Sequence, residues 1–161
     1  MAVTYLAVLL SLLATAFSAV CPEPFEAVGD QCYYFSTSEL EWQEARDFCK
    51  TLSAENTSDL AVFDLACEDY RRIFLHVANQ GYLYFWIGGS DLGHEGYWTW
   101  IDGRPIDLTA SYWDAAEPEA SMDYNCLVMS PQTEYISRWR LRDNGCNSVR
   151  YFVCQLGINA N

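Results

Sequence analysis

Apolar residues recur at helical spacing in the first half of the chain. In one stretch they stand three or four residues apart: Trp42, Ala45, Cys49 and Leu52. This period predicts a helix over residues 39–51. Ser38 and Glu41 stand three residues apart just before the stripe, which is the spacing of a capping box.

A second apolar stripe follows an acidic start. Asp64 is expected to cap this helix, and Glu68 and Asp69 favour the positive end of its dipole. The stripe itself consists of Tyr70, Ile73, Phe74 and Val77. Gly81 then marks the expected end of the helix.

Beyond Gly81 the pattern changes to short runs of β-prone residues. The runs cover residues 82–87, 97–101, 127–129, 139–141 and 151–153, and residues 33–35 form an earlier one. Helices followed by strands predict an α+β fold with an antiparallel sheet. Residues 104–125 show little periodicity, and a loop of that length in a compact domain is often functional.

The first residues differ from the rest of the chain. Residues 1–20 carry no charged side chain, and only two polar residues interrupt the run from Leu6 to Phe17. Small residues then follow, so we expect a signal peptide over 1–19 and a secreted, extracellular domain over 20–161, with its core at 21–155. The alternative is a membrane anchor, but this run is short for a span, and no later stretch is long and apolar enough.

Charge and composition narrow the possible partners. The chain has 22 acidic and 9 basic residues, a formal net charge of −13. A nucleic-acid binder needs positive surface to displace counterions, so nucleic acid is not expected as a partner. The 25 aromatic residues, 6 Trp, 11 Tyr and 8 Phe, supply ample core material and argue against disorder.

Seven cysteines fit a secreted protein, in which most should be paired. The number is odd, so at least one has no partner within the chain, and counting alone does not choose the pairs. No two cysteines stand at the C-x-x-C spacing of a metal site. Asn56 opens an N-glycosylation sequon, Asn56-Thr57-Ser58, that we expect to be occupied.

Three motifs and the cysteine order resemble the long form of the C-type lectin-like domain, over Cys21–Gln155. The motifs are Trp86-Ile87-Gly88-Gly89, where the family has W-I-G-L, Glu117-Pro118-Glu119, where it has E-P-N or Q-P-D, and Leu141-Arg142-Asp143, where it has W-N-D. The resemblance implies two helices, small antiparallel sheets and a long loop region stapled by a disulfide. As a single secreted domain, the chain is similar to invertebrate immune lectins.

The resemblance also implies a pairing of the cysteines. It implies the disulfides Cys21–Cys32, Cys49–Cys154 and Cys126–Cys146. Cys67 is left over; it lies in line with Tyr70 and Phe74, which favours a buried thiol over a bridge between chains.

A calcium site is implied at the loop and strand motifs. Glu117, Glu119 and Asp143 would ligate Ca²⁺ and bind sugar hydroxyls, with Asp123 as a further ligand and a cis bond at Pro118. Glu119 stands where the family has Asn, and Arg142 stands where it has the strand Asn. A guanidinium cannot ligate a cation. Arg142 therefore either turns outward, where it donates to the sugar, or folds into the cluster and replaces the ion with its own charge.

Alternation places three arginines on one face of a strand: Arg138, Arg140 and Arg142. They would either bind an anionic ligand or balance nearby acids. Trp139 and Leu141 point the other way and are expected in the core.

The predicted function is a secreted lectin that binds glycans through Ca²⁺, in pattern recognition for innate immunity, with microbial surface polysaccharide as a candidate ligand. Single sugars bind such domains weakly, so avidity calls for a homo-oligomer. The alternative is a module that binds protein or anionic ligands without calcium. An enzyme is not expected: Glu117 and Glu119 fit the ligand motif better than the acid pair of a glycosidase.

Overall fold

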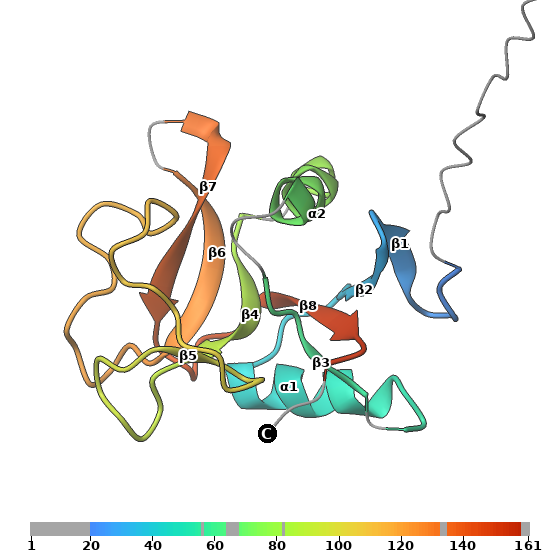
Figure 1. Ribbon diagram of the computed structural model, residues 1–161, viewed down its shortest axis with the longest axis horizontal. Coiled ribbons are helices and arrows are strands. Elements are labelled where there is room, and N and C mark those ends of the chain that lie inside the picture. Colours follow the sequence, from blue (N-terminus) through green and yellow to red (C-terminus); the bar gives the residue numbers. More distant parts are fainter. Residues whose placement is uncertain (1–19, 56, 64–67, 82, 133–134, 159–161) are drawn as a thin grey trace, which may run out of the picture.

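The computed structural model describes residues 20–55, 57–63, 68–81, 83–132 and 135–158. Two helices surround a set of β-strands, with α1 beneath the strands and α2 above them in Figure 1. Along the chain the elements are β1 (Glu26–Val28), β2 (Gln31–Phe35), α1 (Trp42–Thr51), β3 (Ser58–Leu60), α2 (Glu68–Asn79), β4 (Phe85–Ser90), β5 (Thr99–Trp100), β6 (Cys126–Gln132), β7 (Tyr135–Asn144) and β8 (Tyr151–Leu156). The α+β class is confirmed.

The strands lie in the order β1-β2-β8-β4-β6-β7, while β3 pairs with β8 and β5 pairs with β4. All these pairs are antiparallel except β4 and β8, which run parallel with Phe85 opposite Tyr151. The expectation of a wholly antiparallel sheet is therefore wrong at this one pair. A parallel pair needs a long crossover, and the chain between β4 and β8 supplies it through β5, the long loop, β6 and β7.

Helix α1 begins later than the sequence predicts. Leu40 exchanges two backbone hydrogen bonds with Arg150, both 3.0 Å long, so this part of the chain is extended and the helix starts only at Trp42. The capping box predicted from Ser38 and Glu41 is therefore wrong. It is formed one turn later, where Glu44 accepts a 3.3 Å hydrogen bond from the amide of Glu41.

The described side chains of both apolar stripes face the core, as predicted. Trp42, Ala45 and Cys49 are buried on α1, and Ile73, Phe74 and Val77 are buried on α2. The buried indole of Trp42 donates a 2.9 Å hydrogen bond to the carbonyl of Ile87. Burial and a satisfied polar atom thus fix the helix against the middle of β4.

Two glycines let β4 lie close to its neighbours. A Cβ on Gly88 would come within 2.8 Å of the Leu60 carbonyl oxygen. One on Gly89 would come within 2.3 Å of the Leu127 side chain. The W-I-G-G motif is therefore a packing motif in which the last two positions must lack a side chain.

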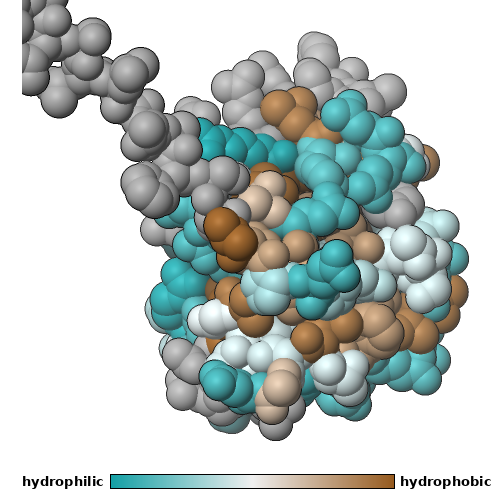
Figure 2. All heavy atoms as spheres, turned by 90° about the vertical axis from the view of Figure 1, so that its right-hand side faces the viewer, coloured by the Kyte–Doolittle hydropathy of each residue, from teal (hydrophilic) through white to brown (hydrophobic). Residues whose placement is uncertain are grey.

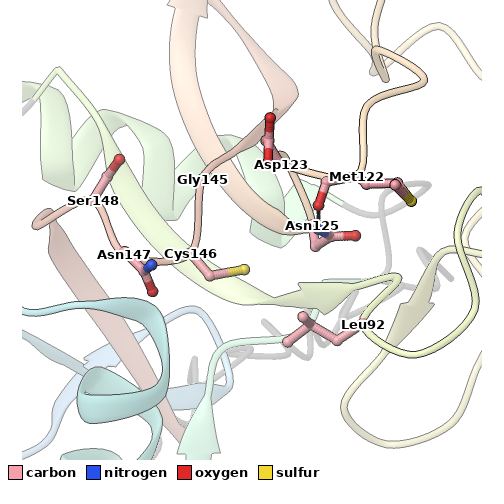
Figure 3. Close-up of a pocket in the computed structure, with 8 residues that line it drawn as sticks. All are labelled: Leu92, Met122, Asp123, Asn125, Gly145, Cys146, Asn147 and Ser148. Carbon is pink, nitrogen blue, oxygen red and sulfur yellow. Dashed lines mark hydrogen bonds between the residues drawn. The ribbon is translucent and has the colours of Figure 1, made fainter.

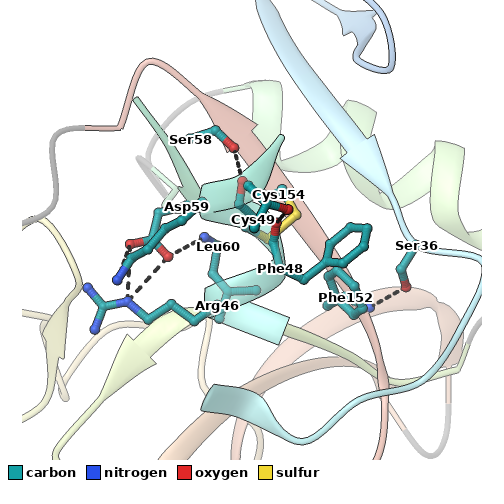
Figure 4. Close-up of a disulfide and its surroundings, with 11 residues drawn as sticks. Ser36, Arg46, Phe48, Cys49, Ser58, Asp59, Leu60, Phe152 and Cys154 are labelled. Atoms are coloured by element: carbon teal, nitrogen blue, oxygen red, sulfur yellow. Dashed lines mark hydrogen bonds and ion pairs between the residues drawn. A yellow bond between two sulfur atoms is a disulfide. The ribbon is translucent and has the colours of Figure 1, made fainter. Parts of the chain in front are cut away.

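Three disulfides connect Cys21 to Cys32, Cys49 to Cys154 and Cys126 to Cys146. These are the pairs that the resemblance implies. Figure 4 shows the Cys49–Cys154 bond beside Asp59, whose carboxylate is almost fully buried and accepts hydrogen bonds from Arg46 at 3.1 Å and from the amide of Leu60 at 2.8 Å. The bond and the ion pair together tie α1 to β3 and β8.

Between β5 and β6 the chain forms the expected long loop, without a helix or a named strand. It fills the yellow-to-orange side of Figure 1, next to β6 and β7. Trp113 anchors it: its ring packs edge-on against Trp98 at 5.8 Å, and its indole donates a 3.0 Å hydrogen bond to the Asp107 carbonyl. The loop therefore contributes to the core instead of extending freely into solvent.

Figure 2 shows polar and apolar side chains interspersed on one face of the molecule. Among the described residues, no helix has the length and apolar character to cross a bilayer. The expected signal peptide over residues 1–19, the sequon residue Asn56 and the odd cysteine Cys67 lie outside the described residues.

The Cys49–Cys154 bond should stabilise the fold more than the Cys21–Cys32 bond. The two bonds join residues 105 and 11 positions apart. Loop-closure entropy then predicts that replacing the first pair by alanine lowers the free energy of unfolding by about 5 kcal/mol, and the second pair by about 3 kcal/mol. Denaturant unfolding of both double variants measures this, and an equal loss in the two would contradict it.

Candidate functional site

Three carboxylates from two separate parts of the chain line one pocket of about 400 Å³. Glu117 and Glu119 come from the long loop, and Asp143 comes from the end of β7, where it lies opposite Leu127 of β6. Tyr84, Tyr124 and Arg142 line the same pocket. We call it the carboxylate pocket. The structure thus brings together three of the four predicted calcium ligands.

Backbone pairing between the loop and β7 positions these groups. The amide of Leu141 donates to the carbonyl of Tyr112 at 2.8 Å, and the amide of Asp114 donates back to Leu141 at 3.1 Å. The amide of Glu117 then donates to the Asp114 carbonyl at 3.1 Å. The loop motif is therefore held beside the strand motif by main-chain bonds that do not depend on the acidic side chains.

The peptide bond between Glu117 and Pro118 is cis, as the resemblance implies. The residue before it, Ala116, has a positive φ of 68°, which is uncommon for a residue other than glycine. Such conformations persist where surrounding contacts impose them, and they cluster at binding sites. Glu117 and Glu119, on either side of the proline, both face the pocket.

The electrostatics of the carboxylate pocket show an excess of negative charge. Asp143 is only 7% exposed, and burial is the first cause that raises its pKa from 3.8 to about 8. The hydrogen bond and the charge of Glu117 raise the pKa further, and the charge of Glu119 adds to them. Three carboxylates that share one pocket favour either the uptake of a proton or the binding of a cation.

Two buried oxygens support a cation at this place. Glu117 Oε2 and Asp143 Oδ2 are buried, and neither has a hydrogen-bond partner among the described residues. Carboxylate oxygens are the ligands that Ca²⁺ prefers, and leaving them unpaired is costly. In the described part of the chain, however, no group of three His, Cys, Asp or Glu side chains is arranged closely enough to hold a metal by itself. The carboxylate oxygens of the pocket fit calcium in their chemistry. The remaining ligands of the ion would have to come from other groups.

Arg142 forms an ion pair that the sequence did not indicate. Its Nη2 donates to Oδ2 of Asp114, a residue of the long loop. Neither predicted role of Arg142 describes this arrangement fully: its side chain lines the pocket, and its charge is paired with Asp114. The ion pair joins loop to strand, and for Arg142 it favours the balancing of acids over the anion-binding role.

Asp123 does not lie with the other three acids. It lines a neighbouring pocket of about 440 Å³ with Leu92, Met122, Asn125 and residues 145–148, shown in Figure 3. The next residue, Tyr124, faces the carboxylate pocket in its place. In the turn that precedes β6, the Tyr124 amide donates a 3.0 Å hydrogen bond to the Ser121 carbonyl.

The family model described as the Lectin C-type domain matches residues 38–156. The chain belongs to the C-type lectin family. Human C-type lectin domain family 17, member A is 33% identical over 135 residues, which cover 84% of this chain and 32% of that protein. The chain thus spans about a third of the length of this curated relative.

Solved C-type lectin structures share the fold. The carbohydrate-recognition domain of the mouse scavenger receptor C-type lectin is 27% identical and superposes with a TM-score of 0.67, covering 88% of this chain and 99% of that one. The cow CD23 domain, solved in the presence of an oligosaccharide, is also 27% identical, with a TM-score of 0.66 and the same coverage. C-type lectins are in general binding proteins and not enzymes.

Several residues of this C-type lectin site were missed by the sequence analysis. Tyr84, Asn144 and Arg150 line the carboxylate pocket, and Asp114 pairs with Arg142. Tyr84 falls inside the predicted strand run 82–87 and Arg150 just before the run 151–153, and neither run by itself indicates a binding residue. The place of both residues at the pocket follows from the pairing of β4 with β8, which no local pattern reveals.

The raised pKa of Asp143 predicts how stability depends on pH when no cation is bound. The folded protein keeps a proton that the unfolded chain loses above about pH 4, until the folded group ionises near pH 8. The melting temperature in a chelator should therefore fall as the pH rises between these values. Asp143→Asn, which cannot ionise, should flatten this slope.

Asp123→Asn is the matched control, because Asp123 is exposed and lies in the neighbouring pocket. Differential scanning calorimetry at several pH values measures both variants. An Asp143→Asn protein with the same slope as the unchanged protein would show that Asp143 ionises normally in the fold.

Proposed function

We propose that this C-type lectin domain binds carbohydrate through a calcium ion at the carboxylate pocket. The observation that carries the proposal is the meeting of Glu117, Glu119 and Asp143 in one pocket with two unpartnered buried oxygens. Two neighbours with 27% identity are named carbohydrate-recognition domains, and one of them was solved in the presence of an oligosaccharide. These names support the ligand class, and the chemistry of the pocket supports the ion.

Glu117, Glu119 and Asp143 would hold the ion, and a bound Ca²⁺ supplies open coordination positions that adjacent sugar hydroxyls can fill. The chain's own residues do the remaining work. Glu117 and Glu119 accept hydrogen bonds from hydroxyls, and Arg142 and Asn144 supply donors. Tyr84 and Tyr124 are 39% and 41% exposed and offer aromatic faces to the apolar side of a sugar ring.

We also propose that the domain acts outside the cell. A domain with three disulfides suits an oxidising, extracellular location, which agrees with the expected signal peptide over residues 1–19. A secreted lectin of this kind would serve innate immunity by binding microbial surface polysaccharide. Assembly into a homo-oligomer would raise the weak affinity of each single site.

A second candidate is binding of protein or anionic ligands without calcium. The ion pair of Arg142 with Asp114 favours it, since a permanent positive charge stands at the position where the family supplies an amide ligand. The two candidates differ in one observable property, because only the first requires a divalent ion.

The calcium proposal predicts the effect of removing one ligand at a time. Glu117→Gln and Asp143→Asn should each weaken Ca²⁺ binding about tenfold or more, because each removes a charged oxygen ligand. Both should abolish the retention of the protein on immobilised glycans. Calorimetric titration with Ca²⁺ and a glycan array with and without EDTA measure these effects.

Asp123→Asn serves as control and should leave calcium and glycan binding unchanged, since it lies in the other pocket. Glycan binding that survives EDTA, or that survives both site variants, would contradict the proposal. Binding to proteins alone would support the second candidate.

Replacing Arg142 tests how its charge acts on the ion. Arg142→Asn removes a positive charge from the pocket, adds an amide oxygen and frees Asp114, so Ca²⁺ should bind about threefold to tenfold more tightly. Arg140→Asn, on the same strand but outside the pocket, should have no effect. Weaker calcium binding in Arg142→Asn would instead show that the ion pair is needed to hold the loop in place.

A further inference from the structure

We propose that Arg150 binds an acidic substituent, a sulfate, phosphate or carboxylate group, on the saccharide held at the carboxylate pocket. The inference rests on the proposed function and extends it from sugars in general to acidic sugars. Its basis is a guanidinium that stands at the edge of the pocket and has no carboxylate partner.

Arg150 lies where two pockets adjoin. It lines the carboxylate pocket, and it also lines a pocket of about 240 Å³ with Glu39, Leu83, Tyr84 and Tyr151. Tyr84 is shared in the same way. A saccharide seated at the three carboxylates would therefore have Arg150 and Tyr84 as its neighbours on this side.

The backbone holds Arg150 firmly in this place. Its amide and carbonyl each form a 3.0 Å hydrogen bond with Leu40, and the Leu40 carbonyl also accepts a 2.9 Å bond from the indole of Trp86. The guanidinium carbon lies 5.7 Å from the centre of the Tyr84 ring, a cation–π contact. A group positioned in advance loses little entropy when it binds.

Among the described residues Arg150 takes part in no ion pair, whereas three other arginines do. Arg46, Arg104 and Arg142 each pair with an aspartate. Among the described residues no carboxylate lies within ion-pair distance of Arg150: its Nη1 donates to the adjacent Val149 carbonyl at 2.8 Å, and its Nε is buried without a partner. The guanidinium is always charged and presents several N–H donors. In so acidic a protein it is therefore suited to bind an anionic group of the ligand.

The surroundings limit what the anion is attached to. Glu117, Glu119 and Asp143 line the same pocket and repel a chain with many negative charges, such as a nucleic acid. Glu39 disfavours an anion deep in the adjoining pocket. A ligand with one acidic group on an otherwise neutral sugar avoids both repulsions. Its neutral ring contacts the carboxylates and their ion, and its acidic group contacts Arg150.

The test compares neutral sugars with their acidic counterparts. The purified full chain is titrated in calcium against albumin that carries galactose, sulfated galactose, mannose, mannose phosphate, glucose or glucuronate. We expect the acidic member of at least one pair to bind about tenfold more tightly than its neutral counterpart, the effect of one charge-assisted bond. Arg150→Gln should make the acidic and neutral members of that pair bind equally, whereas Arg150→Lys should retain part of the preference.

Arg140→Gln is the matched control, an arginine of β7 that does not line the pocket. Equal binding of every neutral and acidic pair would overturn the inference alone, as would an acidic preference that persists in Arg150→Gln or that disappears in Arg140→Gln. If no conjugate binds in a calcium-dependent way, the proposed function falls, and this inference falls with it.

Discussion

The pairing of β8 is the constraint on which the rest of the molecule depends. This strand lies between β2 and β4, also pairs with β3, and carries Cys154, whose disulfide to Cys49 fixes helix α1 beneath it. Because β4 runs parallel to β8, the chain must cross over through the long loop and the hairpin of β6 and β7. The long loop is part of this crossover, and the carboxylate pocket lies where the loop meets β7.

The loop has no regular structure, yet it is not free. Trp113 buries its ring against Trp98, and main-chain bonds to Leu141 attach the loop to β7. This attachment places the Glu117-Pro118-Glu119 motif next to Asp143, and the ion pair of Arg142 with Asp114 reinforces it. A rigid sheet thus presents a loop, the usual arrangement for binding residues that must vary while the scaffold stays the same.

The carboxylate pocket is defined by its charged side chains. Three acids with one pKa raised to about 8 form a site that stores electrostatic repulsion until a cation or proton relieves it. The guanidinium of Arg142 is engaged with Asp114, and that of Arg150 stands at the rim over Tyr84. Opposite charges therefore occupy different parts of one small surface.

The order of the helices and strands, their buried faces and the meeting of Glu117, Glu119 and Asp143 follow from the sequence, because periodicity records burial and the ordered motifs are specific for this family. The start of α1, the parallel pair, the place of Asp123 and the partner of Arg142 do not. Leu40 meets Arg150, and Asp114 meets Arg142, only after segments distant in the chain have paired. Local patterns report which side of an element is buried, whereas tertiary pairing decides which residues face each other across the pocket.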